Sequence, residues 1–225
     1  DLAGKRIAVI GTGASAIQFI PRIAPRAESL AIHQRTPPWI LPKADRAVGP
    51  FEQALTRTLP PWRWLMRQKT YWLHEVAGLA FANPGLMTWV EARALAHMRA
   101  SIADPGLRAR LTPDYRLGCK RVLISNDYYP TLNRPNVALV TAPVAEVQAD
   151  AIVTADGVER KADAIIFGTG FRATDFLSPV EIRGRGGIAL ARAWGNGAEA
   201  YLGTTVAGYP NLFFRVGPNT GLGHN

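Results

Sequence analysis

The sequence predicts an α/β fold with a parallel, Rossmann-like sheet, a β-meander and a helical insertion. Three observations predict it. An apolar run over residues 6–10 passes directly into the glycine motif Gly11-x-Gly13-x-x-Ala16. Apolar residues at helical spacing follow the motif, and a second apolar run ends at residue 33. A strand, a glycine turn and a helix in this order are typical of doubly wound parallel sheets.

The first β-α-β unit is expected over residues 5–36. The run at 6–10 lacks an alternation of apolar and polar residues, as expected of a strand that is buried on both faces of a sheet. The helix begins after the glycine motif, and Pro21 inside it should kink or shorten it. The second strand is expected over 30–33.

Residues 50–111 are expected to form a helical insertion between strands. Helices are predicted over 62–81 and over 86–102, where apolar residues keep helical spacing. Four of the six Trp residues fall in the insertion: Trp62, Trp64, Trp72 and Trp89. An aromatic stripe of this kind is more typical of a core or an interface than of a ligand site.

Strands are expected again over residues 121–170. Their predicted positions are 122–124, 137–140, a β-meander over 144–161 around Asp156-Gly157, and 164–167. Turn-rich segments follow, and a last strand is expected over 212–216. The chain begins at Asp1 without Met and stops soon after Gly217-Pro218, which predicts a segment of a longer protein.

The composition predicts a folded core without a membrane-spanning segment. Of the 225 residues, 48% are apolar and 19% are charged, which argues against disorder. The longest apolar stretch, residues 76–82, is far shorter than the ~20 residues of a membrane helix. A single Cys and the lack of a basic, apolar leader favour a cytoplasmic protein. The four His residues lack metal-ligand spacing, so no metal is expected.

The net charge is +9 and unevenly distributed. Residues 1–112 hold 15 Lys and Arg against 7 Asp and Glu, whereas residues 113–225 hold 11 against 10. A basic half attracts an anion, which could be nucleic acid, a membrane surface or a phosphorylated small molecule. Because the positive residues are scattered and do not form runs, the charge pattern argues against nucleic acid.

The glycine motif is the strongest local indication of chemistry. Gly11 permits a tight turn, Gly13 permits close approach of a pyrophosphate to the backbone, and a small residue at position 16 lets helix and strand pack. The phosphates would then lie at the helix N-terminus. The alternative is a tight turn without a ligand.

The end of the second strand indicates which dinucleotide is bound. An NAD or FAD site has Asp or Glu there to bind the ribose 2′-hydroxyl, and none occurs between Leu30 and Pro38. Arg35 can pair instead with a 2′-phosphate, and Thr36 adds a hydroxyl donor. The sequence therefore predicts NADP(H); otherwise Arg35 is a solvated charge at the strand end.

Residues 118–121 place two cations beside a glycine. Lys120 and Arg121 are adjacent, a pattern most typical of surface charges. Cys119 has no obvious base nearby, so a buried structural thiol is expected there in preference to a nucleophile.

Several segments together resemble the Baeyer–Villiger monooxygenases, which are flavoproteins that depend on NADPH and FAD. The segments are 7–16 (IAVIGTGASA), 34–39 (QRTPPW), 118–121 (GCKR), 126–130 (NDYYP), 163–171 (DAIIFGTGF), 210–214 (PNLFF) and Gly217-Pro218. The segments occur in the same order as in the family, and together they extend over nearly the whole chain. The resemblance implies a ketone substrate that is oxygenated by O₂ to an ester or a lactone.

The family fold implies a division of the chain. Residues 1–170 resemble the NADPH-binding domain with its helical insertion at about 50–111, and 171–225 resemble the start of the second FAD-domain segment. The first FAD segment, with its own glycine motif, is not in this sequence. The chain alone is therefore expected to be inactive, and its partner is the remainder of its own FAD domain.

The resemblance also implies the site residues. Arg121 corresponds to the family's active-site arginine. A guanidinium suits that role, since it cannot lose its charge beside an oxygen that becomes negative. Lys120 joins Arg35 and Thr36 at the 2′-phosphate. The remaining expected cofactor-binding residues are Gly11, Thr12, Gly13, Ala14, Ser15, Thr169, Gly170 and Gly217.

Three other functions stay open at this point. An N- or S-oxygenating flavin monooxygenase shares the two-domain plan, although residues 118–121 favour the ketone-oxygenating family. A non-catalytic NADPH-binding module would need no FAD half. Nucleic-acid binding by the basic half would show steep salt dependence.

Overall fold

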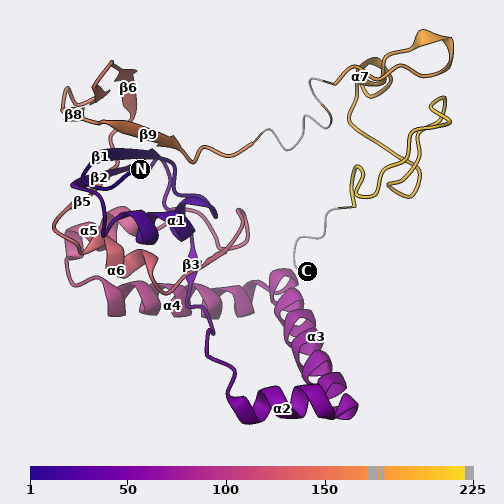
Figure 1. The fold of residues 1–225 in the computed structure, drawn as a ribbon, viewed down its shortest axis with the longest axis horizontal. Helices are drawn as coiled ribbons and strands as arrows, with labels where there is room; N and C mark the ends of the chain where they lie inside the picture. The colour runs from indigo at the N-terminus through magenta and orange to yellow at the C-terminus, as the bar shows by residue number, and fades with distance from the viewer. Residues whose placement is uncertain (172–176, 178–179, 221–225) are drawn as a thin grey trace. The chain divides into compact units, whose positions relative to one another are not determined.

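A four-stranded parallel sheet organises the first of the two units into which the chain divides, Asp1–Gly170 and Phe171–Asn225. The computed structural model describes residues 1–171, 177 and 180–220 (Figure 1). His224, one of the four histidines, lies outside the described residues. The α/β fold class is confirmed.

The sheet has the strand order β5-β2-β1-β9, with every pair parallel. Its strands are β1 (Arg6–Ile10), β2 (Ser29–His33), β5 (Val137–Val140) and β9 (Ala164–Phe167). Helix α1 (Ala16–Ile23) connects β1 to β2 and has only eight residues, with Pro21 inside it. The predicted β-α-β unit is confirmed, and its strands run toward one edge where their carboxyl ends meet.

Alternate residues of the strands supply two different cores. Ile7 and Val9 of β1 join Leu30 and Ile32 of β2 in the cluster that includes Ile20 of α1. Helix α6 (Tyr128–Leu132) lies on this same side of the sheet (Figure 1). The strand period of two explains this separation, because neighbouring side chains point to opposite faces.

The other face of the sheet is covered by the predicted meander, which is confirmed. Its strands are β6 (Val144–Val147), β7 (Ala151–Thr154) and β8 (Glu159–Lys161), paired antiparallel in that order. Ile152 of β7 packs with Ala8 of β1 and with Ala162. Ile10 of β1 and Ile165 of β9 pack against the same cluster, so the meander covers this face of the sheet.

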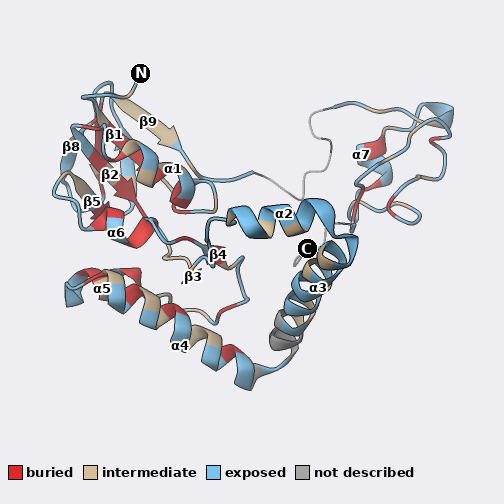
Figure 2. Cartoon of the chain, turned by 60° about the horizontal axis from the view of Figure 1, so that its bottom comes forward, coloured by how far each residue is buried: buried red, intermediate tan, exposed pale blue. Residues whose placement is uncertain are grey.

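The helical insertion is also confirmed. It comprises α2 (Pro50–Thr58), α3 (Pro60–Ala82), α4 (Pro84–Ser101) and α5 (Pro105–Leu111). Met98 and Ile102, at the end of α4, enter the main core, whereas α2 and the described side chains of α3 are largely exposed (Figure 2). In the part of the chain that the structure describes, no helix combines the length and the apolarity needed to span a bilayer.

The Trp residues of the insertion do not form a core of their own. Trp64, Trp72 and Trp89 are each more than 60% exposed. Their exposure contradicts a core role for these three aromatics, and an interface stays a prediction.

One expected strand lies outside the main sheet. The run at 122–124 forms only β4 (Leu123–Ile124), which pairs in parallel with β3 (Ile40–Leu41). Backbone hydrogen bonds run from Leu123 N to Trp39 O at 2.9 Å and from Ser125 N to Leu41 O at 3.0 Å. This small sheet fixes the loop that precedes β4.

The second unit contains short elements around a small cluster. Its helical turns are η1 (Arg185–Gly187) and α7 (Leu190–Ala193), and Leu190, Trp194 and Tyr209 are buried together. The strand predicted over 212–216 is wrong, because only an isolated bridge joins Phe213 to Thr205. Phe213 is 68% exposed, so this apolar run has too few neighbours in the described unit to build a ladder.

An ion pair connects the first and last strands of the sheet at their amino ends. The Arg6 guanidinium donates to both Asp163 carboxylate oxygens, with Nε–Oδ2 at 3.1 Å and Nη2–Oδ1 at 2.6 Å. The Arg6 backbone N–H also donates to Oδ2 at 2.8 Å. Hydrogen bonds from the Arg6 side chain, and then from its backbone, lower the pKa of Asp163 to about 2.

We expect Asp163→Asn to reduce the stability of the protein at pH 7, because it removes the charge and keeps the shape. The pKa of Asp163 is about 2, whereas an unfolded Asp titrates near ~3.9. The stabilisation is therefore complete above about pH 4 and is lost as the pH falls toward 2. Urea unfolding at a series of pH values should show the difference between the two proteins shrinking over this range.

Asp45→Asn is the matched control for this measurement, since Asp45 pairs with Lys43 on an exposed segment. It should change the urea midpoint little at any pH. A difference for Asp163→Asn that stays constant down to pH 2 would show that its charge is not what connects the strands.

Candidate functional site

A cavity of about 450 Å³ opens at the carboxyl edge of the parallel sheet. Its walls come from the turn after β1, from residues 33–38 after β2, from the turn after β9, and from a loop at 115–123. The strand order reverses direction between β1 and β9, and ligands of open α/β sheets bind at such a switch point.

Gly11 lets the turns after β1 and β9 approach each other. Its φ is +108°, a region that side chains disfavour, and a Cβ at this position would overlap the carbonyl oxygen of Gly168. The Gly168 N–H donates to Ile10 O at 2.8 Å, and the Gly11 N–H donates to His33 O at 2.9 Å. Close backbone contact therefore explains the first glycine of the motif.

Gly13 has a different environment. A Cβ at Gly13 would meet no atom within 4 Å, so its backbone borders open space in the cavity. The helical hydrogen bonds begin with the Ile17 N–H and Gly13 O at 3.1 Å. The N–H groups of the first turn therefore have no partner within the helix, and they favour an anion.

The third position of the motif is occupied by Ala16, which is buried against the turn after β9. A Cβ placed on Gly168 would lie 3.4 Å from the Ala16 Cβ, so a larger residue at position 16 would press on that turn. The small side chain lets α1 begin close to the strand, as the sequence predicts.

Three cations line the cavity without acidic partners. Arg35, Lys120 and Arg121 all contribute to its walls, and neither Asp nor Glu is among the described residues that line it. Within those same residues, no carboxylate forms an ion pair with any of the three. The cavity is therefore electropositive and suited to an anion that brings more than one negative charge.

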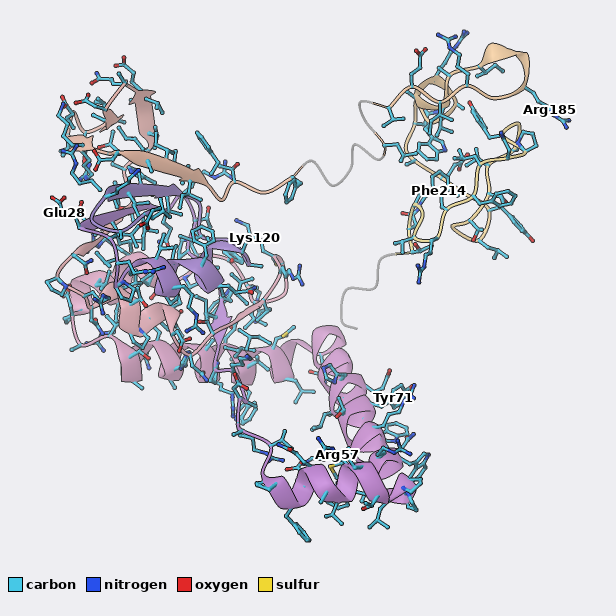
Figure 3. All side chains as sticks on the ribbon, in the orientation of Figure 1. Glu28, Arg57, Tyr71, Lys120, Arg185 and Phe214 are labelled. Carbon is cyan, nitrogen blue, oxygen red and sulfur yellow. The ribbon has the colours of Figure 1, made fainter. Side chains whose placement is uncertain are left out.

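The loop that carries two of these cations is held by the helical insertion. The Leu117 N–H donates to Glu91 Oε1 of α4 at 2.9 Å, and Trp39 Nε1 donates to Tyr115 O at 2.8 Å. Leu117 also packs with Trp39 and with Met87 of α4. Lys120 lies on this loop (Figure 3). Its Nζ is 4.5 Å from the centroid of the Tyr115 ring.

The structure brings most of the predicted site residues to this single cavity. Those that line it are Gly11, Thr12, Gly13, Ala14, Arg35, Thr36, Lys120, Arg121, Thr169 and Gly170. Ser15 is exposed at the N-cap of α1, outside the lining. Gly217 belongs to the second unit, where it lies against Gly203, so its contact with a cofactor stays a prediction.

The expectation of a buried thiol at Cys119 is wrong, because Cys119 is exposed. Its N–H donates to Arg116 O at 3.1 Å in a turn of the loop, and Leu117 supplies the buried contact with α4 instead. No cluster of His, Cys, Asp or Glu that could hold a metal ion occurs over residues 1–171, 177 and 180–220.

Two lining residues with polar side chains, Tyr115 and His33, were missed by sequence reasoning. Tyr115 gives no sequence signal, because its place depends on the packing of the insertion. His33 is the last residue of β2, directly before Gln34-Arg35, which marks it as a strand-end residue. Burial, and then the charge of Arg160, lower the pKa of His33.

Curated relatives match the chain over its whole length. It is 52% identical to a Baeyer–Villiger monooxygenase of Pseudomonas aeruginosa and 49% identical to one of Streptomyces coelicolor, with 100% of this chain aligned in both. The chain spans 43% and 44% of the length of these two relatives. No family model matches the sequence.

Solved structures agree with these relatives. The open crystal form of cyclohexanone monooxygenase covers 97% of this chain with a TM-score of 0.82 at 29% identity. A complex of OTEMO with FAD and NADP covers all of it with a TM-score of 0.83 at 30% identity. The chain corresponds to 50% and 48% of those two chains.

The two glycines of the motif should respond differently to alanine. We expect Gly11→Ala to destabilise the protein by about 1–3 kcal/mol, because its backbone conformation and its contact with Gly168 both disfavour a side chain. At position 13 there is room for the added methyl group, so the free energy of unfolding of Gly13→Ala should lie within about 0.5 kcal/mol of the parent's. Thermal and urea unfolding of both variants test this, and equal losses would contradict it.

Proposed function

Because the chain belongs to the Baeyer–Villiger monooxygenase family, we propose that it is the NADPH-binding part of an enzyme that oxygenates ketones. The full reaction uses NADPH, FAD and O₂ and yields an ester or a lactone. The relatives' names favour a ketone substrate over oxygenation at nitrogen or sulfur.

The observation that carries the proposal is the cavity at the glycine turn, where three cations have no carboxylate partner among the described residues. A carboxylate at the end of β2 would bind a ribose 2′-hydroxyl and repel a 2′-phosphate. Arg35 follows β2 instead, with Thr36 beside it. This arrangement supports NADPH in preference to NADH.

The cavity also fits the rest of the dinucleotide. Its volume of about 450 Å³ falls within the ~300–1,000 Å³ of typical ligand sites. The pyrophosphate would be held by the backbone of residues 11–14 and by the N-terminus of α1. When bound, NADPH supplies a hydride and FAD supplies the redox chemistry with O₂.

Arg121 is proposed to hold a fixed positive charge where negative charge develops on oxygen. It lines the cavity beside Lys120 and has no carboxylate partner among the described residues. A guanidinium keeps its charge at any working pH and offers a rigid fork of donors. Lys120 would then serve the 2′-phosphate with Arg35.

The second unit is proposed to begin the FAD-binding part. The boundary between the units follows Gly170, at the end of the turn that lines the cavity. OTEMO, which aligns with the whole chain, has been solved with both FAD and NADP. On this proposal, residues 171–225 and Gly217 contribute to FAD binding together with the remainder of that domain.

We expect Arg35→Ala to weaken NADPH binding by about 1.5–3 kcal/mol, the scale of a hydrogen bond to a charged group, and to leave NADH binding nearly unchanged. Titration calorimetry with both cofactors measures the difference. Arg57→Ala on the exposed helix α2 is the matched control and should alter neither affinity (Figure 3). An equal loss for both cofactors would remove Arg35 from the 2′-phosphate site.

We expect Arg121→Ala, in the protein complete with its flavin-binding part, to lower product formation from a ketone by ~10²-fold, or about 3 kcal/mol. Arg121→Lys should restore it only in part, because a point charge on a flexible stem cannot reproduce the fork. NADPH affinity should change less than in Arg35→Ala.

Stopped-flow spectra of flavin reduction and a product assay on the same variant separate hydride transfer from oxygenation. Normal product yield in Arg121→Ala would show that Arg121 is only a surface charge.

A further inference from the structure

His33 is a titratable residue inside the wall of the proposed NADPH cavity. It is 4% exposed and lines the cavity from the end of β2. In the sheet register it lies beside Ile10 of β1 and Val140 of β5. The imidazole therefore has apolar neighbours along the sheet and an electropositive cavity at the strand end.

The ring of His33 has unused hydrogen-bonding capacity. Neither Nδ1 nor Nε2 has a partner among the residues that the structure describes, although both are buried. By contrast, His97 Nε2 lies 2.9 Å from Ser125 O. Buried polar groups in folded proteins nearly always have partners, so this pair of orphaned nitrogens calls for a physical role.

Among the described residues, the charged groups that act on His33 or line its cavity are cations. Arg160 of β8 acts on it from the meander side, where the Arg160 guanidinium donates to Thr154 Oγ1 at 2.9 Å and has no carboxylate partner among the described residues. The carboxylate of Asp156 accepts a hydrogen bond from the Thr154 hydroxyl at 2.6 Å and interacts with Arg160, also on the meander side. On the cavity side are Arg35, Lys120 and Arg121, together with Tyr115, a phenol whose pKa is raised by burial. Burial and the charge of Arg160 both lower the pKa of His33 and so favour the neutral imidazole.

We propose that binding of a 2′-phosphorylated nucleotide in this cavity is coupled to protonation of His33. One N–H bond forms, with the proton taken from solvent, and the imidazolium then partly balances the two negative charges of the phosphate. Affinity for NADP(H) should consequently rise as the pH falls from about 8 toward 6.5, whereas affinity for NAD(H) should not. This inference rests on the proposed NADPH site and adds to it the uptake of a proton when the nucleotide binds.

The direction of proton transfer separates this mechanism from its main competitor. A free phosphate monoester has a second pKa of about 6, and a cluster of cations that removes its last proton would release that proton on binding. Protonation of His33 on binding would instead take up a proton, because burial and Arg160 favour the neutral imidazole in the free protein. Net proton uptake therefore identifies a group of the protein.

The test is titration calorimetry of the chain with NADP⁺ at pH 7.5, in two buffers that differ in their enthalpy of protonation. We expect a fraction of a proton to be taken up per NADP⁺ bound, and none for NAD⁺, which lacks the 2′-phosphate. Between pH 8 and pH 6.5 the affinity for NADP⁺ should rise by about fivefold, within the range that an opposite charge near a histidine produces.

His33→Gln should abolish both the proton uptake and the pH dependence of binding. The matched control is His74→Gln, since His74 is exposed on α3 and its Nδ1 contacts only the Thr70 carbonyl of its own helix. That control should behave as the parent. Because His33 is buried and its variant could fail to fold, NMR titration of the parent provides a second readout: one imidazole signal should move to a higher pKa when NADP⁺ is added.

Each outcome decides between the two proposals. Binding of NADP⁺ with proton release, or with no proton transfer, would overturn the role of His33 and leave the NADPH site intact. If a folded His33→Gln variant still takes up a proton when NADP⁺ binds, the proton belongs to another group. That result would also overturn the role of His33. Failure of NADP⁺ to bind at any pH would overturn the proposed site itself.

Discussion

The contact between the turns after β1 and β9 is the constraint on which the site depends. Gly11 and Gly168 bring two backbone segments together at the switch point of the sheet, and no side chain fits between them. This contact sets the start of α1 and therefore the direction of its free N–H groups. It also places Thr169 and Gly170 at the mouth of the cavity that Gly13 borders. The first glycine of the motif therefore has a structural role, because it permits this close backbone approach.

Charge in the cavity is arranged by elements far apart in the sequence. Arg35 comes from the end of β2, whereas Lys120 and Arg121 come from a loop held by Trp39 and by Glu91 of α4. Three uncompensated cations repel one another, so their arrangement disfavours the empty site and favours an anion. The helical insertion thus contributes to the site through the loop that it positions.

Local sequence patterns predicted most helices and strands well. They failed where tertiary contacts decide whether a segment forms a strand or whether a side chain is buried. The strands of the parallel sheet follow from short apolar runs, because a buried strand needs only apolar residues on both faces. The meander follows from the alternation of residues around the Asp156-Gly157 turn. The equally apolar run at 212–216 is not a strand, since Phe213 finds only Thr205 as a bridge partner. Burial at Cys119 was also misjudged, because one residue of a turn faces solvent while Leu117, two positions earlier, packs inward.

The sequence by itself determined the glycine turn, the basic residue at the end of β2 and the absence of an acid there, because these depend on adjacent positions in one β-α-β unit. Only the tertiary structure decided that Arg35, Lys120, Arg121 and Tyr115 line one cavity. It also decided that the ring of His33 is buried beside them with no hydrogen-bond partner in the described part of the chain. The physical reason is that strand order and loop packing bring together segments that are far apart in the sequence, such as residues 33–38 and 115–123. No local pattern encodes which segments will meet at the carboxyl edge of a sheet.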